Sequence, residues 1–139
     1  MHAKATTKID SIWNKLAVGQ PYRTPDNAKG AVFTIVNIHR DFIVIETEGD
    51  PSKNRRGSHV GITQASFISA LEYLYANQNT QNNRCPIASN NKTSLAGPLC
   101  RASRIHNGDT RCITYILPIL KKFELVEING SRPNRTWYT

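Results

Sequence analysis

The acidic side chains that could hold a catalytic metal ion are concentrated in one short segment. Asp41, Glu46, Glu48 and Asp50 follow one another there, and Lys53 comes next. A metal-dependent nuclease needs two or three carboxylates with a nearby lysine, because the bound divalent ion activates a water molecule. Neither glutamate is followed by a lysine two positions later, as such sites usually require. A nuclease site of Asp41, Glu46 and Glu48 is therefore an alternative and not the main prediction.

Cysteine and histidine are the other residue types that could do chemistry. The three cysteines, Cys85, Cys100 and Cys112, form no C-x-x-C pair. His106 lies between the last two, but this spacing fits none of the usual zinc patterns. An odd number of separated cysteines favours reduced thiols in a cytoplasmic compartment. We interpret them as small buried apolar side chains and expect neither a metal nor a cofactor.

Basic side chains exceed acidic ones, and the excess is unevenly distributed. The chain has 139 residues, with 18 Lys and Arg against 10 Asp and Glu and a formal net charge of +8. Residues 1–83 hold nine basic and seven acidic side chains, so +2, whereas residues 84–139 hold nine and three, so +6. This balance indicates a polyanionic partner that binds mainly the C-terminal part. No run approaches the ~20 apolar residues of a membrane helix, so we expect no membrane association.

The N-terminal part is predicted to form a small α/β unit. Ile9, Ile12 and Leu16 recur at helical spacing, and two runs rich in β-branched residues are joined by a hairpin-length turn. The loop before the third predicted strand carries Arg55 and Arg56, which we expect to touch a nucleic-acid backbone. The predicted elements are a helix at 8–17, a loop at 19–27 and strands at 31–38, 42–48 and 58–62.

The C-terminal part holds the clearer helical patterns. Thr63 is a good N-cap for its first helix, and Asp109 or Thr110 is expected to cap its last one. Pro118 lies inside that last helix and removes a backbone hydrogen bond, so we expect a kinked or broken helix. Residues 78–93 are polar and are predicted to be a surface linker, because they cannot bury enough apolar area. The predicted elements are helices at 64–77, 97–105 and 110–123 and strands at 125–128 and 136–139, the strands flanking a basic loop at 129–135.

The order of elements in residues 63–139 is helix, helix, turn, helix, strand, basic loop and strand. This order resembles the winged helix-turn-helix family of DNA-binding domains. The segment from Ile116 to Ile128 is similar to the join between a recognition helix and its wing. A small α/β unit followed by a basic winged helix also resembles the non-catalytic regions of restriction endonucleases. We therefore expect an α+β fold: a small N-terminal helix with a β-hairpin or three-stranded sheet at 1–62, then a winged-helix-like domain at 63–139.

The resemblance also implies which side chains would meet DNA. A recognition helix presents its N-terminal residues to the major groove. Arg111 is suited to a bidentate contact with guanine, and Asn107 to one with adenine. The residues expected near base edges are Asn107, Thr110, Arg111, Thr114 and Tyr115. Those expected on phosphates or in a minor groove are Arg101, Arg104, Arg132, Asn134 and Arg135.

These observations predict sequence- or modification-selective binding of double-stranded DNA. The chain would act as the target-recognition module of a restriction or defence protein, or as a regulator. Two alternatives remain open: the small metal-dependent nuclease, and a winged helix that binds another protein. Besides double-stranded DNA, the partners considered are a second copy of the chain and a nuclease domain that follows Thr139. We assign no catalytic residue within these 139 residues.

Overall fold

The structure is a computed structural model that describes residues 2–25, 30–49, 52, 57–131 and 133–139. Its elements are, in chain order, α1 (His2–Trp13), β1 (Pro21–Arg23), β2 (Val32–Ile38), β3 (Phe42–Thr47), β4 (His59–Thr63), α2 (Gln64–Ala76), β5 (Cys85–Pro86), the 3-10 helix η3 (Thr93–Leu95), α3 (Pro98–Arg104), α4 (Ile113–Lys122), β6 (Val126–Asn129) and β7 (Arg135–Tyr138). Within the described residues, one antiparallel sheet has the order β1-β2-β3-β4 and a second has the order β5-β7-β6. The predicted α+β class is confirmed.

The four-stranded sheet contains the three predicted strands and one that the sequence did not indicate. In β3, Ile43 and Ile45 are fully buried while Glu46 is exposed, so alternate side chains face the core. The extra strand, β1, lies within the predicted loop, and its Tyr22 stacks on Phe33 of β2 at 5.6 Å between ring centroids. The loop prediction is wrong here. The three residues of β1 are too few to show a periodicity, and they form a strand only because they pair with the edge of β2.

The first helix begins earlier and ends earlier than predicted. α1 spans His2–Trp13 and not 8–17, and it buries Ala5, Ile9 and Ile12. Trp13 packs edge-on against Phe67 of α2, with 5.3 Å between the ring centroids. Ile9 is the first large apolar residue of the buried helix face. Ala5 belongs to the same face, but alanine is small and common on both faces of helices, so it did not indicate the helix start. The prediction was therefore displaced toward the C-terminus.

The segment predicted to be a surface linker is partly built into the second sheet. The preceding helix α2 is confirmed, and its cap Thr63 accepts a hydrogen bond from the Ser66 N–H group. Farther along, Cys85 and Ile87 are buried and β5 pairs with β7. The linker prediction is wrong for these residues. Two buried side chains are too few to show in a polar stretch, but pairing with β7 satisfies their backbone hydrogen bonds.

The two helices of the predicted helix-turn-helix are α3 and α4. Pro98 occupies the first turn of α3, as expected. α4 starts at Ile113 after the cap residue Cys112, so the prediction of a cap at residue 109 or 110 is wrong. α4 also continues through Pro118 without a break, so the helix is not broken there. Only one backbone hydrogen bond is lost at this proline, and burial of the apolar face outweighs that loss.

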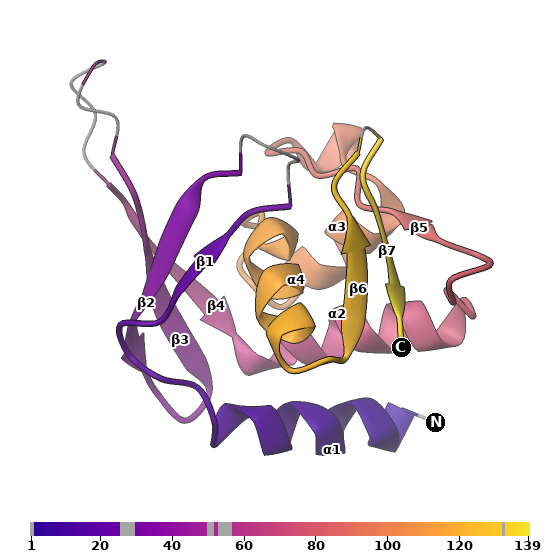
Figure 1. The fold of residues 1–139 in the computed structure, drawn as a ribbon, viewed down its shortest axis with the longest axis horizontal. Coiled ribbons are helices and arrows are strands. Elements are labelled where there is room, and N and C mark those ends of the chain that lie inside the picture. Colours follow the sequence, from indigo (N-terminus) through magenta and orange to yellow (C-terminus); the bar gives the residue numbers. More distant parts are fainter. Residues whose placement is uncertain (1, 26–29, 50–51, 53–56, 132) are drawn as a thin grey trace.

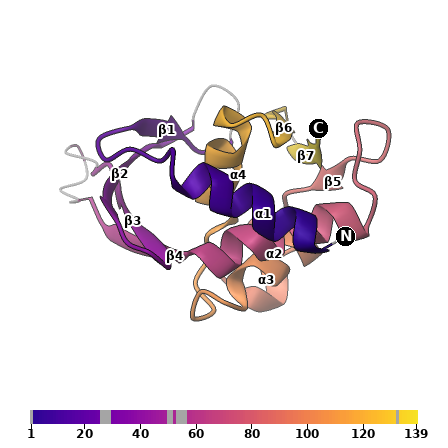
Figure 2. The same cartoon turned by 90° about the horizontal axis from the view of Figure 1, so that it is seen from below.

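The helices connect the two sheets. α4 lies between the four-stranded sheet and the β6–β7 hairpin, and α1 runs along α2 beneath them (Figure 1). The view turned by 90° shows the same arrangement, with α3 beside α2 (Figure 2). Buried side chains from both sides of the predicted boundary at residues 62 and 63 form one hydrophobic cluster. The two predicted units therefore share a core, and they are held in a defined relation that creates a cleft.

Candidate functional site

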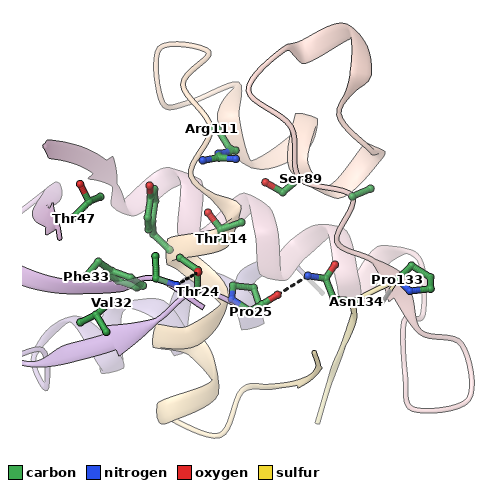
Figure 3. Close-up of a pocket in the computed structure, with 13 residues that line it drawn as sticks. Thr24, Pro25, Val32, Phe33, Thr47, Ser89, Arg111, Thr114, Pro133 and Asn134 are labelled. Carbon is green, nitrogen blue, oxygen red and sulfur yellow. Dashed lines mark hydrogen bonds between the residues drawn. The ribbon is translucent and has the colours of Figure 1, made fainter. Parts of the chain in front are cut away.

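A large cavity lies between the four-stranded sheet and the start of α4 (Figure 3). Its volume is about 1030 Å³, at the upper end of the range typical for small-molecule sites. β2 and β3 contribute Phe33 and Thr47, and the C-terminal part contributes Ser89, Arg111 and Thr114. A second cavity of about 440 Å³ adjoins it. Both cavities are lined by Thr47, Arg111 and Tyr115, so they lie side by side, and together they are called the cleft.

Arg111 is the charged side chain of the larger cavity. It is half-buried, and it forms no hydrogen bond or ion pair with any residue that the structure describes. None of the described residues lining that cavity is acidic. Asp109 reaches only the smaller cavity, where its carboxylate accepts a 2.8 Å hydrogen bond from Thr93. A guanidinium group without a counter-charge has the chemistry to pair with an anion.

Two polar side chains and an aromatic ring accompany Arg111. The Oγ atom of Ser89 is buried and has no hydrogen-bond partner among the described residues. Thr114 lies in the first turn of α4, and Figure 3 shows Ser89, Arg111 and Thr114 around the same opening. The ring of Tyr115 packs edge-on against Phe33, with 5.1 Å between centroids and 77° between ring planes. Among its described lining residues, the larger cavity thus combines one cation, free hydroxyl groups and aromatic surface.

The loop that carries Ser89 is held firmly in place. Ala88 has a φ of 44°, which is uncommon for a residue other than glycine, and its carbonyl accepts a 2.9 Å hydrogen bond from the Gly97 N–H group. A Cβ atom added at Gly97 would lie 2.5 Å from the Ala88 Cβ atom, so only glycine allows this approach. On the opposite side of the loop, Arg104 binds the carbonyl groups of Asn90 and Asn91. Ser89 is therefore fixed at the cleft.

Arg104 does not have the role that the sequence suggested. Its side chain is 2% exposed. It donates hydrogen bonds of 2.7 Å and 2.8 Å to the carbonyl oxygens of Asn90 and Asn91, and one of 3.3 Å to that of Asp109. The expected phosphate contact is corrected, because a buried guanidinium with three carbonyl partners cannot reach DNA. Spacing along α3 does not reveal that this arginine points inward.

Asn107 is also occupied by contacts within the chain. Its side-chain oxygen accepts a 3.0 Å hydrogen bond from the Thr63 N–H group, and its amide donates one of 3.1 Å to the Gly61 carbonyl. These bonds join the turn between α3 and α4 to the start of α2. The contact with adenine expected for Asn107 would require both bonds to break, so Asn107 is corrected to a structural residue.

The remaining predicted residues are dispersed. Arg101 is exposed and donates a hydrogen bond to the Ala96 carbonyl, away from the cleft. Arg135 lines a separate cavity of about 500 Å³ together with Arg84, whose guanidinium lies 4.1 Å from the Trp137 ring centroid. Asn134 lines the cleft and donates to the Pro25 carbonyl, and the exposed Thr110 lines its smaller part. Arg55, Arg56 and Arg132 lie outside the described residues.

The side of α4 is less accessible than the family resemblance implies. β1 packs alongside α4, and a narrow groove of about 370 Å³ between them is lined by Tyr22, Arg23, Pro118 and Lys121. The ring of Tyr115 is turned toward Phe33 in β2. A large partner can therefore approach α4 at its N-terminal end, near Arg111, but not along its whole length.

The three carboxylates of the alternative nuclease site do not come together. Asp41 precedes β3, whereas Glu46 and Glu48 lie at or beyond the other end of that strand. Five residues of extended chain span about 17 Å, whereas ligands of one divalent ion lie about 2.0–2.6 Å from it. Glu46 faces His59 at 3.8 Å, and Glu48 accepts a hydrogen bond from the Val32 N–H group. The nuclease alternative is corrected for these residues.

Two of the cysteines are also unsuited to nucleophilic chemistry. Cys112 and Cys85 are buried free thiols, and burial raises the pKa of each to about 11. Only the thiolate is a nucleophile, so both remain inert near neutral pH. This agrees with their interpretation as small buried side chains.

Comparison of the chain with protein-family models, with curated proteins and with solved structures gave no match. Among the described helices, none has both the length and the apolar character needed to cross a membrane. The cleft therefore has to be interpreted from its own geometry. Six of the residues predicted from the sequence line the cleft: Arg104, Thr110, Arg111, Thr114, Tyr115 and Asn134. Ser89, Thr47 and Phe33 were not predicted, because they belong to distant segments and show no shared pattern.

Proposed function

We propose that this chain binds double-stranded DNA and that Arg111, at the start of α4, makes the main contact. The observation that carries the proposal is the half-buried guanidinium without a partner among the described residues, in a cavity whose described lining has no carboxylate. A phosphate diester is the anion that such a site suits, because charge-assisted hydrogen bonds to arginine are strong and directional.

The order of elements supports this proposal. The succession α2-β5-α3-α4-β6-β7, with the sheet order β5-β7-β6, resembles a winged helix-turn-helix. In that family the second helix of the helix-turn-helix approaches DNA with its N-terminal end. Here β1 covers the side of α4, so the contact is expected at the end near Arg111. The contact of Arg111 with guanine stays a prediction.

The distribution of charge along the chain also supports the proposal. Residues 84–139 carry the larger excess of basic side chains, and Arg135 lies on the hairpin that corresponds to a wing. An exposed arginine at this position is suited to a phosphate, a contact that adds affinity without sequence information. DNA binding of this kind fits a target-recognition module of a restriction or defence protein, or a regulator. The buried free thiols fit a cytoplasmic location.

The proposal is tested by titrating labelled duplex DNA with the protein at ~50 and ~200 mM salt, using fluorescence anisotropy. Binding dominated by phosphate contacts weakens by orders of magnitude over this range. Arg111→Ala is expected to raise the Kd about tenfold, corresponding to ~1.4 kcal/mol. Arg135→Ala is expected to weaken all duplexes alike and to reduce the salt slope by about one.

The matched control is Lys122→Ala. Lys122 is an exposed cation at the far end of the same helix, and it lines none of the four cavities described here. It should change the Kd less than twofold, because Lys122 lies away from the proposed site. If binding depended on net charge alone, the two variants would weaken it equally. Equal effects of Arg111→Ala and Lys122→Ala would contradict the proposed site. Absence of duplex binding at low salt would favour the alternative, a winged helix that binds a protein.

A further inference from the structure

We infer that the cleft receives one nucleotide, with its phosphate on Arg111 and its base inside the larger cavity. This inference rests on the proposed function and deepens it, because it names what enters the site. A base in a duplex is stacked and cannot enter a cavity unless the nucleotide rotates out of the helix. The occupant is therefore a nucleotide everted from DNA, and a free nucleotide has the same chemistry.

The size of the cleft fits this occupant. A cavity of about 1030 Å³ is larger than one phosphate group needs, but it suits a ligand of nucleotide size. It is bounded by the sheet on one side and by α4 on the other. At one side of the cavity, the hydrogen bond from Asn134 to the Pro25 carbonyl joins the wing to the loop after β1 (Figure 3). This bond holds together two segments that line the cavity.

The polar groups fit a phosphate and the edge of a base. Arg111 supplies a cation, and Ser89 supplies a buried hydroxyl group with no partner among the described residues. A buried polar atom without a partner is unfavourable, so a ligand that pairs with Ser89 Oγ removes this cost. No carboxylate among the described residues lines the larger cavity to repel the phosphate. These features select an anion that also carries hydrogen-bonding groups.

The apolar lining fits the faces of a base. Val32, Phe33, Tyr115 and Ala31 line the larger cavity, and Tyr115 is only half-buried. Part of its ring is therefore available to a flat aromatic ligand, whereas Phe33, at 1% exposure, supports the ring from behind. Contact between an aromatic side chain and a base is tolerant of base identity. Discrimination between bases therefore depends on the hydroxyl groups of Ser89 and Thr114.

The test uses duplex DNA with 2-aminopurine in one mismatched pair at its centre. A mismatched base everts at the lowest cost, so it defines the position without knowledge of a target sequence. Unstacking of 2-aminopurine increases its fluorescence. With saturating protein we expect a severalfold increase, and we expect the mismatched duplex to bind about tenfold more tightly than the matched one. Anisotropy of the same samples reports duplex binding independently.

The second arm uses free nucleotides. Deoxyadenosine and deoxycytidine monophosphates are titrated by calorimetry, with the corresponding nucleosides as controls for the phosphate. Binding of a monophosphate that is lost in Arg111→Ala supports the inference. Ser89→Leu, which extends a side chain into the cavity, should abolish the 2-aminopurine increase and weaken monophosphate binding at least tenfold. Ser94→Leu is the matched control, because Ser94 is exposed and lines none of the four cavities.

Each result separates the inference from the proposed function. Duplex binding without a fluorescence increase, without a preference for the mismatch and without monophosphate binding would overturn the inference and leave the proposed function intact. Monophosphate binding without duplex binding would support the cleft as a site for free nucleotides and overturn DNA binding. If Ser89→Leu fails to fold, Ser89→Ala removes only the hydroxyl group and should weaken monophosphate binding at least threefold. An unchanged affinity would count against the assigned contact.

Discussion

Two arginines on either side of the α3–α4 turn have opposite environments. Arg104 is 2% exposed and donates to three backbone carbonyl groups. Arg111 is half-buried and has no partner among the described residues. Both stand in the same basic stretch of sequence, and both were predicted to contact DNA. The difference shows that charge and spacing identify a basic region, whereas the hydrogen-bond partners of each side chain decide whether it stabilises the fold or is free to bind.

The largest expected effect is on stability at Arg104. Arg104→Ala removes a large buried side chain and the charged donor of the Asn90 and Asn91 carbonyl groups, so the free energy of unfolding should fall by about 3 kcal/mol. Arg111→Ala breaks no described hydrogen bond and should change the free energy of unfolding by less than ~0.5 kcal/mol. Urea unfolding followed by circular dichroism measures both values.

Arg104→Lys refines this comparison. Lysine keeps the charge but cannot reach two carbonyl groups with a planar fork, so it should recover only part of the lost stability. Equal stabilities of Arg104→Ala and Arg111→Ala would mean that burial and partners do not distinguish the two arginines, and the comparison would fail.

An intermediate effect is expected at Asn107, in the turn between the two arginines. Asn107→Ala removes the hydrogen bonds to Thr63 and Gly61 and should lower the free energy of unfolding by about 2 kcal/mol. The Kd for duplex DNA, measured where the variant is still folded, should stay within twofold of the original value. A variant with unchanged stability and weakened DNA binding would restore Asn107 as a base-reading residue.

The smallest expected effect concerns the buried thiols and appears only at alkaline pH. Burial raises the pKa of Cys85 and Cys112 from 9.0 to about 11 in the folded chain. A raised folded-state pKa contributes stability that is present below pH 9 and is lost as the pH rises toward 11. The loss should be about 1 kcal/mol for each thiol at pH 10.

Urea midpoints between pH 7 and 10.5 measure this effect, and Cys85→Ala/Cys112→Ala is the comparison. The variant should have a shallower decline above pH 9. Some decline should remain in it, because burial also raises the pKa of Tyr22. Identical pH profiles for the two proteins would show that the thiols do not titrate as their burial requires.

The sequence alone determined the elements whose side chains repeat with a regular period. The strands β2 and β3 alternate apolar residues, α2 has its cap at Thr63, and α4 has a continuous apolar face. Such patterns depend on residues a few positions apart, because the periods of strand and helix decide which side chains share a face. The basic character of residues 84–139 and the involvement of Arg111 in a candidate site also followed from the sequence.

Only the tertiary structure decided where the short strands lie, which arginine is buried and what forms the cleft. β1 and β5 are too short to show a period, and each exists because a neighbouring strand offers an edge. Arg104 turns inward because three carbonyl groups, up to 14 positions away in the sequence, converge on it. The cleft joins Phe33, Ser89 and Arg111, which no local pattern connects. Contacts between distant segments depend on how all elements pack together, so they can be read only from the folded structure.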